Sequence, residues 1–255
     1  MSNIWAVCKK EIKTYFTSPI AYVTITVFLV LAGFFFQNLI LWFNQYSMQM
    51  AQNPSYLQQI NINQMVFSPL FHNISLILLF IIPFLTMRLF SEEMKRKTDE
   101  LLYTSPISVK QIILGKYFAS LFVLLVMLLL TGILSLLTFV YGNPEVKPIL
   151  IGYLGLFLMG ATFMAIGIFY SSLTENQVVS AALALGTLLL LFVLNWASQF
   201  IQGIWKDVLN YVSFSQHFDN MTKGILDTAD LVYYISFIFL GLFLAHSVIL
   251  SRRWR

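Results

Sequence analysis

The chain has 255 residues and a formal net charge of +4, and 58% of its residues are hydrophobic while 10% are charged. Soluble domains typically have about 25% charged residues, so this composition excludes an ordinary soluble globular protein. Proteins that bind single-stranded nucleic acid combine basic patches with aromatic residues, and this sequence has no such patch, so its positive charge does not indicate nucleic-acid binding. We expect an all-α integral membrane protein.

Residues 3–16 predict an amphipathic helix that lies in the membrane interface. Its apolar residues recur at helical spacing, and its lysines fall on the other side, where they can meet lipid phosphates. Thr17, Ser18 and Pro19 then end this helix, because Ser18 can cap and Pro19 suits the first turn of a following helix. The apolar positions are Ile4, Cys8, Ile12 and Tyr15, and the lysines are Lys9, Lys10 and Lys13.

Six later segments are long and apolar enough to cross a bilayer, which requires about 20 residues per helix. They predict one transmembrane domain over residues 1–255 with little material outside the membrane. The expected spans lie near 20–43, 70–89, 117–140, 149–170, 178–195 and 231–250.

The distribution of Lys and Arg predicts the orientation of the spans. Alternate assignment of the loops puts twelve basic residues on one side and three on the other. The richer side includes the N-terminal segment, the loop between the second and third spans, and the C-terminal tail. We therefore expect a multi-pass protein of the cell (inner) membrane with both termini in the cytoplasm and no cleavable signal peptide.

The loop over residues 90–108 has the densest charge in the chain. Opposite charges at i,i+4 spacing, such as Glu92 with Arg96 and Glu93 with Lys97, favour a helix. Ser108 and Gln111 form a capping-box pattern that begins the third span. A structured, charged surface of this kind is typical of a docking site for a soluble partner, and its residues are Glu92, Glu93, Arg96, Lys97, Thr98, Asp99, Glu100, Leu101, Leu102 and Tyr103.

The expected spans have no ionisable residue deep in the membrane, whereas ion-coupled transporters generally keep such groups there. The chain also has no Gly-x-x-x-x-Gly-Lys-Ser/Thr loop, so we expect no ATP site on it and no catalytic or metal-binding residue. Small residues at four-residue spacing, Ala161 with Ala165 and Ala182 with Gly186, predict close helix contacts. Residues 196–230 are too polar to span and predict surface-lying or re-entrant half-helices at the outer face.

Nearly the whole chain resembles the membrane subunit of an ABC exporter of the type-two permease family. The residues that support the resemblance at the N-terminal side are Lys9 to Pro19, Glu92-Glu93, Thr98 to Leu102, Ser105 to Ser108 and Gly115-Lys116. Ser213 to Asp219, Gly224 to Asp227, Tyr233-Tyr234 and Ser251 to Trp254 resemble the subgroup of gliding-motility and nitrous-oxide-reductase-maturation permeases. Lys97 departs from the pattern, since a small residue, often Gly, is expected there.

The resemblance implies a role for the charged loop. It implies that residues 98–103 form a coupling helix that docks into a separate cytoplasmic ATPase subunit, which would hold the ATP and Mg²⁺. It also implies a second permease subunit, identical or not. Two other functions stay open from sequence: a non-transporting scaffold or mechanotransmission subunit of an ATPase complex, and a membrane enzyme acting on lipids or glycans.

Overall fold

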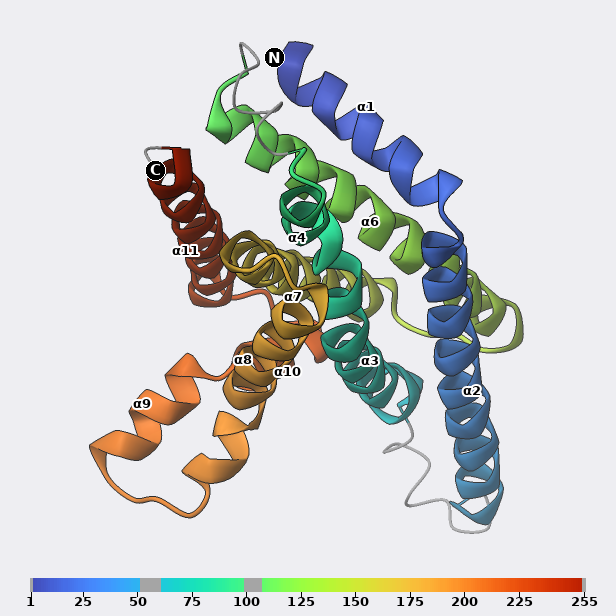
Figure 1. Cartoon of the computed structure of the whole chain (residues 1–255). Helices are drawn as coiled ribbons and strands as arrows, with labels where there is room; N and C mark the ends of the chain where they lie inside the picture. Colours follow the sequence, from blue (N-terminus) through green and yellow to red (C-terminus); the bar gives the residue numbers. More distant parts are fainter. Residues whose placement is uncertain (1, 51–60, 99–106, 254–255) are drawn as a thin grey trace.

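The structure is a computed structural model that describes residues 2–50, 61–98 and 107–253 (Figure 1). Over these ranges the chain is helical and forms no strand. Six helical stretches are long and apolar enough to cross a membrane, and each contains one of the expected segments. They are Pro19–Met50, Asn63–Lys95, Val109–Val140, Val146–Leu173, Gln177–Ser198 and Thr228–Arg252. The predicted fold class, an all-α protein with six membrane-spanning helices, is confirmed.

The described helices fall into two halves of the chain. The first half contains α1 (Ser2–Thr17), α2 (Pro19–Met50), a π-helical turn (Asn63–Phe67), α3 (Ser68–Thr86), α4 (Arg88–Lys95) and α6 (Val109–Tyr141). The second half contains α7 (Val146–Leu173), α8 (Gln177–Ser198), α9 (Ile204–Val212), α10 (Phe214–Thr222) and α11 (Thr228–Arg253).

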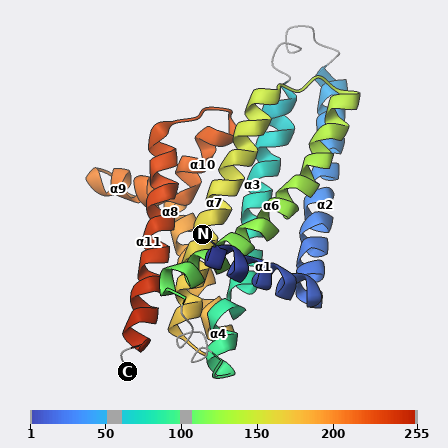
Figure 2. The same ribbon diagram turned by 90° about the horizontal axis from the view of Figure 1, so that it is seen from above.

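Helix α1 lies across the end of the bundle rather than along it. Figure 2 shows α2, α3, α7 and α11 running in roughly the same direction, with α1 lying crosswise to them near the end of the bundle where α4 and the end of α11 also lie. Helix α1 packs beside the first half of α6 (Figure 1). Gly115 permits this approach, since a Cβ there would lie 2.7 Å from the Val7 side chain. The buried face of α1 contains Val7, Cys8 and Tyr15, while Trp5 is exposed.

Helix α7 is the centre of the bundle, and glycines bring its neighbours close. A Cβ on Gly152 would overlap the Phe71 ring of α3, and one on Gly167 would overlap Thr86. Gly241 of α11 lies directly against the backbone of Ala165, which is the kind of close contact that small residues allow between membrane helices. The second predicted small-residue contact is not formed within this chain, because Gly186 faces open space.

The second span is interrupted near its end. Pro83 lies inside α3 and cannot donate a backbone hydrogen bond, so a bend is expected nearby. Helix α3 ends at Thr86, Met87 follows as a turn, and α4 begins at Arg88. The segment expected to lie in the loop after residue 89 therefore begins as a helical extension of the span.

The region after α8 forms two short helices that differ in burial. Helix α9 has no buried residue, whereas α10 buries five, among them Phe214, His217 and Phe218. Helix α10 packs against α7 and α8 and contacts α11. The expected pair of half-helices therefore exists, with one member anchored in the bundle and the other largely exposed.

Candidate functional site

The charged segment predicted to dock a partner begins with α4. Of the ten predicted site residues, Glu92, Glu93, Arg96, Lys97 and Thr98 lie within the described residues. The other five, Asp99, Glu100, Leu101, Leu102 and Tyr103, lie outside them, so their docking role stays a prediction. The predicted i,i+4 pair between Glu92 and Arg96 is formed at 2.6 Å.

The end of α4 explains the unexpected residue at position 97. Lys97 has a φ of 54°, in the left-handed region that glycine favours. The Lys97 amide donates to the Met94 carbonyl and the Thr98 amide donates to the Glu93 carbonyl, both at 3.0 Å. These two bonds form a Schellman motif, in which Lys97 occupies the position usually taken by glycine. The small residue expected at this position suits the positive φ that the helix end needs. Lys97 adopts that φ at a cost in backbone strain.

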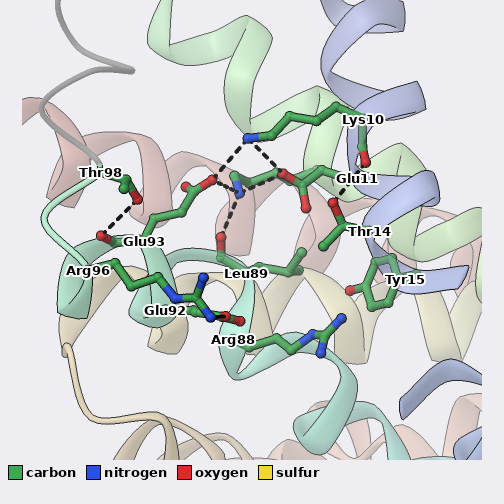
Figure 3. A pocket seen from close by; sticks show the side chains of 11 residues that line it. Lys10, Glu11, Thr14, Tyr15, Arg88, Leu89, Glu92, Glu93, Arg96 and Thr98 are labelled. Carbon is green, nitrogen blue, oxygen red and sulfur yellow. Dashed lines mark hydrogen bonds and ion pairs between the residues drawn. The ribbon is translucent and has the colours of Figure 1, made fainter. Parts of the chain in front are cut away.

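Glu93 does not pair with Lys97 as predicted, but joins a buried charge cluster, which we define as Lys10, Glu11, Glu93 and Lys116 (Figure 3). The Lys116 Nζ atom lies 3.0 Å from Glu11 Oε1 and 2.9 Å from Glu93 Oε1. It also donates to the Leu89 carbonyl at 2.6 Å. Lys10 lies farther out, 3.6 Å from Glu93 Oε1.

Burial sets the energetics of this charge cluster. The Lys116 side chain is 1% exposed, that of Glu11 9% and that of Glu93 17%. A lone ammonium group in such a place would have a large desolvation penalty, which two carboxylates and a carbonyl offset. Lys116 comes from α6, Glu11 from α1 and Glu93 from α4, so the cluster joins three elements far apart in sequence.

Lys116 corrects the expected start of the third span, which was predicted near residue 117. It lies in the second turn of α6, which begins at Val109, and it is buried. The signal was present, because a lysine preceded by Ile112, Ile113 and Leu114 needs an acidic partner when the helix packs. Glu11, in the middle of the buried face of α1, was the matching residue.

A cavity of about 280 Å³ opens beside the charge cluster, between α1 and α4 (Figure 3). Arg88 lines this cavity. The central carbon of its guanidinium group lies 5.4 Å from the centre of the Tyr15 ring, and one guanidinium N–H donates to Ser18 Oγ at 3.3 Å. The Tyr15 hydroxyl donates to the Leu85 carbonyl, and burial raises the pKa of Tyr15. The residues that line the cavity are Lys10, Glu11, Thr14, Tyr15, Arg88, Leu89, Glu92, Glu93, Arg96, Thr98 and Lys116.

Ser171 of α7 fixes the joint between α3 and α4. Its hydroxyl accepts from the backbone amides of Phe90 and Ser91 at 3.0 and 3.2 Å, and it donates to the Met87 carbonyl at 2.8 Å. The Ser91 hydroxyl in turn donates to the Ser171 carbonyl at 3.0 Å. A side chain of α7 thus enters the hydrogen-bond ladder at the break, which is a recognised cause of a helix bend.

Arg252 connects the last helix to the same region. Its guanidinium donates to the Leu173 carbonyl at the C-terminal end of α7, at 2.6 Å, and contacts the Met94 sulfur of α4 at 3.0 Å. A cation is favourable at the end of a helix, where carbonyl groups lack partners. Helix α4 is therefore held by α1, α6, α7 and α11 together.

A second polar group lies at the other end of the bundle. His217 of α10 contacts Asp230 of α11 at 2.6 Å and the Tyr211 carbonyl at 2.9 Å, and its ring stacks on Tyr233 at 3.9 Å. Asn220 donates to the second Asp230 oxygen at 3.3 Å. Both histidine nitrogens have partners, so this arrangement holds α10 against α11.

Comparison with known proteins identifies the chain's family. The family described as ABC-2 family transporter protein matches residues 5–251. The chain belongs to this family. No curated protein matches it.

Membership accounts for the six spans and for the charged end of the bundle. The chain is a multi-pass membrane protein and the permease subunit of an ABC transporter. The family also implies association with an ABC ATPase. At the described charged surface, no nucleophile lies beside a base. Contacts with several helices hold α4 in place, and residues 99–106 follow α4 in the chain.

Proposed function

We propose that this ABC-2 permease subunit works as half of an ATP-driven exporter, with its charged end in the cytoplasm. Two permease subunits would form the path across the membrane, and two separate ATPase subunits would bind ATP and Mg²⁺. Residues 98–103 would be the coupling helix that enters the ATPase. The observation that best supports this proposal is the attachment of α4 to four other helices.

That attachment gives a route for mechanical coupling. Helix α4 lies immediately before residues 98–103, so a push on that segment reaches α4 first. Lys116 ties α4 to α1 and α6, Ser171 ties it to α7, and Arg252 ties it to α11. Because packed interfaces switch between discrete arrangements rather than deform continuously, motion of α4 would be passed to several spans together.

The subgroup proposal rests on the C-terminal half. The motif residues Ser213 to Asp219 and Tyr233-Tyr234 contact one another in the fold: the Tyr234 hydroxyl donates to the Phe214 carbonyl, and Tyr233 stacks on His217. We infer that the chain belongs with the gliding-motility and nitrous-oxide-reductase-maturation permeases. Purification from native membranes followed by identification of the co-purified proteins would reveal the ATPase and any second permease.

A pull-down tests the docking segment directly. Apolar anchors at an interface can each contribute about 2 kcal/mol or more, whereas charges at its rim mainly change association rates. Leu101→Ala combined with Leu102→Ala should therefore reduce retention of the ATPase subunit at least about thirtyfold. Asp99→Asn is the matched control and should reduce it much less.

The comparison uses detergent-solubilised membranes that contain equal amounts of each variant, so a failure of membrane insertion is detected separately. Wild-type retention of the ATPase by the double-leucine variant would exclude residues 98–103 as the docking element. Helix α1 would then be the next candidate, because its Lys9, Lys10 and Lys13 are exposed beside the same cavity-bearing surface.

Thiol labelling in intact cells tests the orientation. The single native cysteine, Cys8, is buried, and burial raises the pKa of its thiol, so it should stay protonated and unreactive. Cysteines introduced at Gln52 and at Gly203 should react with an impermeant reagent, and one at Lys97 should not. Reaction at Lys97 with protection at Gln52 would invert the proposed topology.

A further inference from the structure

A groove of about 450 Å³ lies between the start of α6 and the second half of α11. Its walls are mainly apolar: Ile113 and Leu114 come from α6, and Phe239, Leu242 and Phe243 come from α11. Figure 2 shows α6 beginning close to α11 and then running diagonally away from it, so the two helices diverge.

Two polar side chains, Lys110 and His246, lie at one end of this groove. Lys110 is in the first turn of α6, and His246 lies within two turns of the end of α11, so both are near the end of the bundle that includes α4. Among the described residues, neither has a hydrogen-bond or ion-pair partner. This separates them from Lys116, Arg88 and Arg252, whose partners are all within the fold.

We propose that this groove binds one anionic phospholipid from the leaflet on the side of the chain termini. The acyl chain would lie along Phe239, Leu242 and Phe243, two of which are more than half exposed. The phosphate would meet the Lys110 ammonium group and an N–H of His246. The N-terminal end of α6 adds a partial positive charge at the same place. The site is independent of the transported substrate and goes beyond the proposed function.

A second groove of similar size shows why the polar end matters. It measures about 440 Å³ and lies between α2 and α6 near Gly142, at the opposite end of the bundle. Its lining includes Phe36, Ile40 and Asn44 and no charged residue. The two grooves thus have similar sizes and mainly apolar linings, but of the two only the α6–α11 groove also has Lys110 and His246, which can bind an anionic head group. The second groove should not distinguish phosphatidylglycerol from phosphatidylcholine.

Native mass spectrometry of the full chain, titrated with phosphatidylglycerol or with phosphatidylcholine, tests the proposal. The wild type should retain one phosphatidylglycerol in preference to phosphatidylcholine. A basic residue near the membrane surface attracts anionic lipid by roughly fivefold, so Lys110→Gln should weaken the preference by about that factor. Adding His246→Gln should weaken it further. Lys95→Gln, which removes an exposed lysine from α4 on the same side of the bundle, should leave the preference unchanged.

Steric filling separates the groove from general surface charge. Leu242→Trp would fill the α6–α11 groove while keeping both polar residues, and it should abolish retention of the lipid. Ile40→Trp, the matched change in the other groove, should not. An unchanged preference in the Lys110→Gln, His246→Gln double variant, or an equal loss with Lys95→Gln, would overturn the proposal.

The alternative occupant is a second copy of the chain, which would cover the same apolar face. Phe243→Cys tests this in native membranes, because the native Cys8 is buried and should not interfere. With lipid in the groove, two copies of the variant should not form a disulfide through position 243. Efficient disulfide formation between them would identify the groove as a subunit interface and overturn the lipid assignment.

Discussion

Both ends of the helix bundle have a buried contact between ionisable side chains of different helices, but the two contacts span very different distances along the chain. Lys116 and Glu11 are 105 residues apart, and with Glu93 they join α6, α1 and α4. His217 and Asp230 are 13 residues apart and join α10 to α11. The first contact fixes the arrangement of the bundle, and the second positions one short helix on a bundle already formed.

The end of the bundle that contains α10 shows how local the second effect is. Helices α9 and α10 each have nine residues and follow one another with one residue between them. Helix α10 is buried and has the His217 contact, whereas α9 exposes Ile204, Trp205 and Tyr211. Amphipathic pattern alone therefore does not decide which of two neighbouring helices docks. Helix α10 packs Phe214, Phe218 and Met221 into the bundle in addition to the His217 contact.

Removal of the Lys116 ammonium group should reduce the stability of the fold more than any other change predicted here. Lys116→Met leaves Glu11 and Glu93 buried beside each other with only the exposed Lys10 as a nearby cation, and breaking such a cluster typically costs about 3–5 kcal/mol. We expect a strongly reduced unfolding temperature in detergent, measured by loss of monodisperse protein on heating. Arg96→Gln, which breaks only the exposed pair with Glu92, should cost about 0.5 kcal/mol or less.

A charge-free version of the cluster distinguishes charge balance from packing. Lys116→Met combined with Glu11→Gln and Glu93→Gln removes the uncompensated carboxylates and should recover much of the lost stability. If Lys116→Met alone unfolds at the wild-type temperature, the charge cluster does not anchor α1 and α4.

Loss of the His217–Asp230 contact should have a smaller and more local effect. His217→Ala removes the partner of Asp230 and the ring stacked on Tyr233, and hydrogen bonds to charged groups typically contribute about 1.5–3 kcal/mol. We expect faster amide hydrogen exchange in α10 with little change in α3 and α7. Asp207→Asn on the exposed α9 is the control and should change neither. Equal acceleration throughout the bundle would show that His217 supports the whole fold.

Relief of backbone strain at the end of α4 should give the smallest effect, and a stabilising one. Lys97 has a left-handed conformation, which costs residues other than glycine roughly 1–2 kcal/mol. Lys97→Gly should therefore stabilise the α4 terminus by up to about 1 kcal/mol after the greater flexibility of glycine in the unfolded chain is deducted. Slower hydrogen exchange at the Thr98 amide is the expected sign, and faster exchange there would contradict the Schellman assignment.

Much of the architecture was predictable from local pattern. Six long apolar segments predict six spans, because only a helix satisfies its backbone within the bilayer. The Ser108 and Gln111 capping box is present at the start of α6 as predicted, and Pro19 begins α2. The interfacial α1 was also predicted, although its buried face includes Glu11 as well as apolar residues.

The contacts that make the charged end rigid were decided by tertiary structure. Glu93 has Lys97 four residues away as a local partner, yet it pairs with Lys116, since a buried ammonium group needs a carboxylate more than an exposed one does. The sequence is enough to assign Ser171 to the end of the fourth span, but it does not predict that Ser171 contacts the break between α3 and α4. Sequence by itself determined which segments are helical and apolar, because those properties depend on near neighbours. Which side chains meet across the bundle depends on helix packing, and only the folded chain decides it.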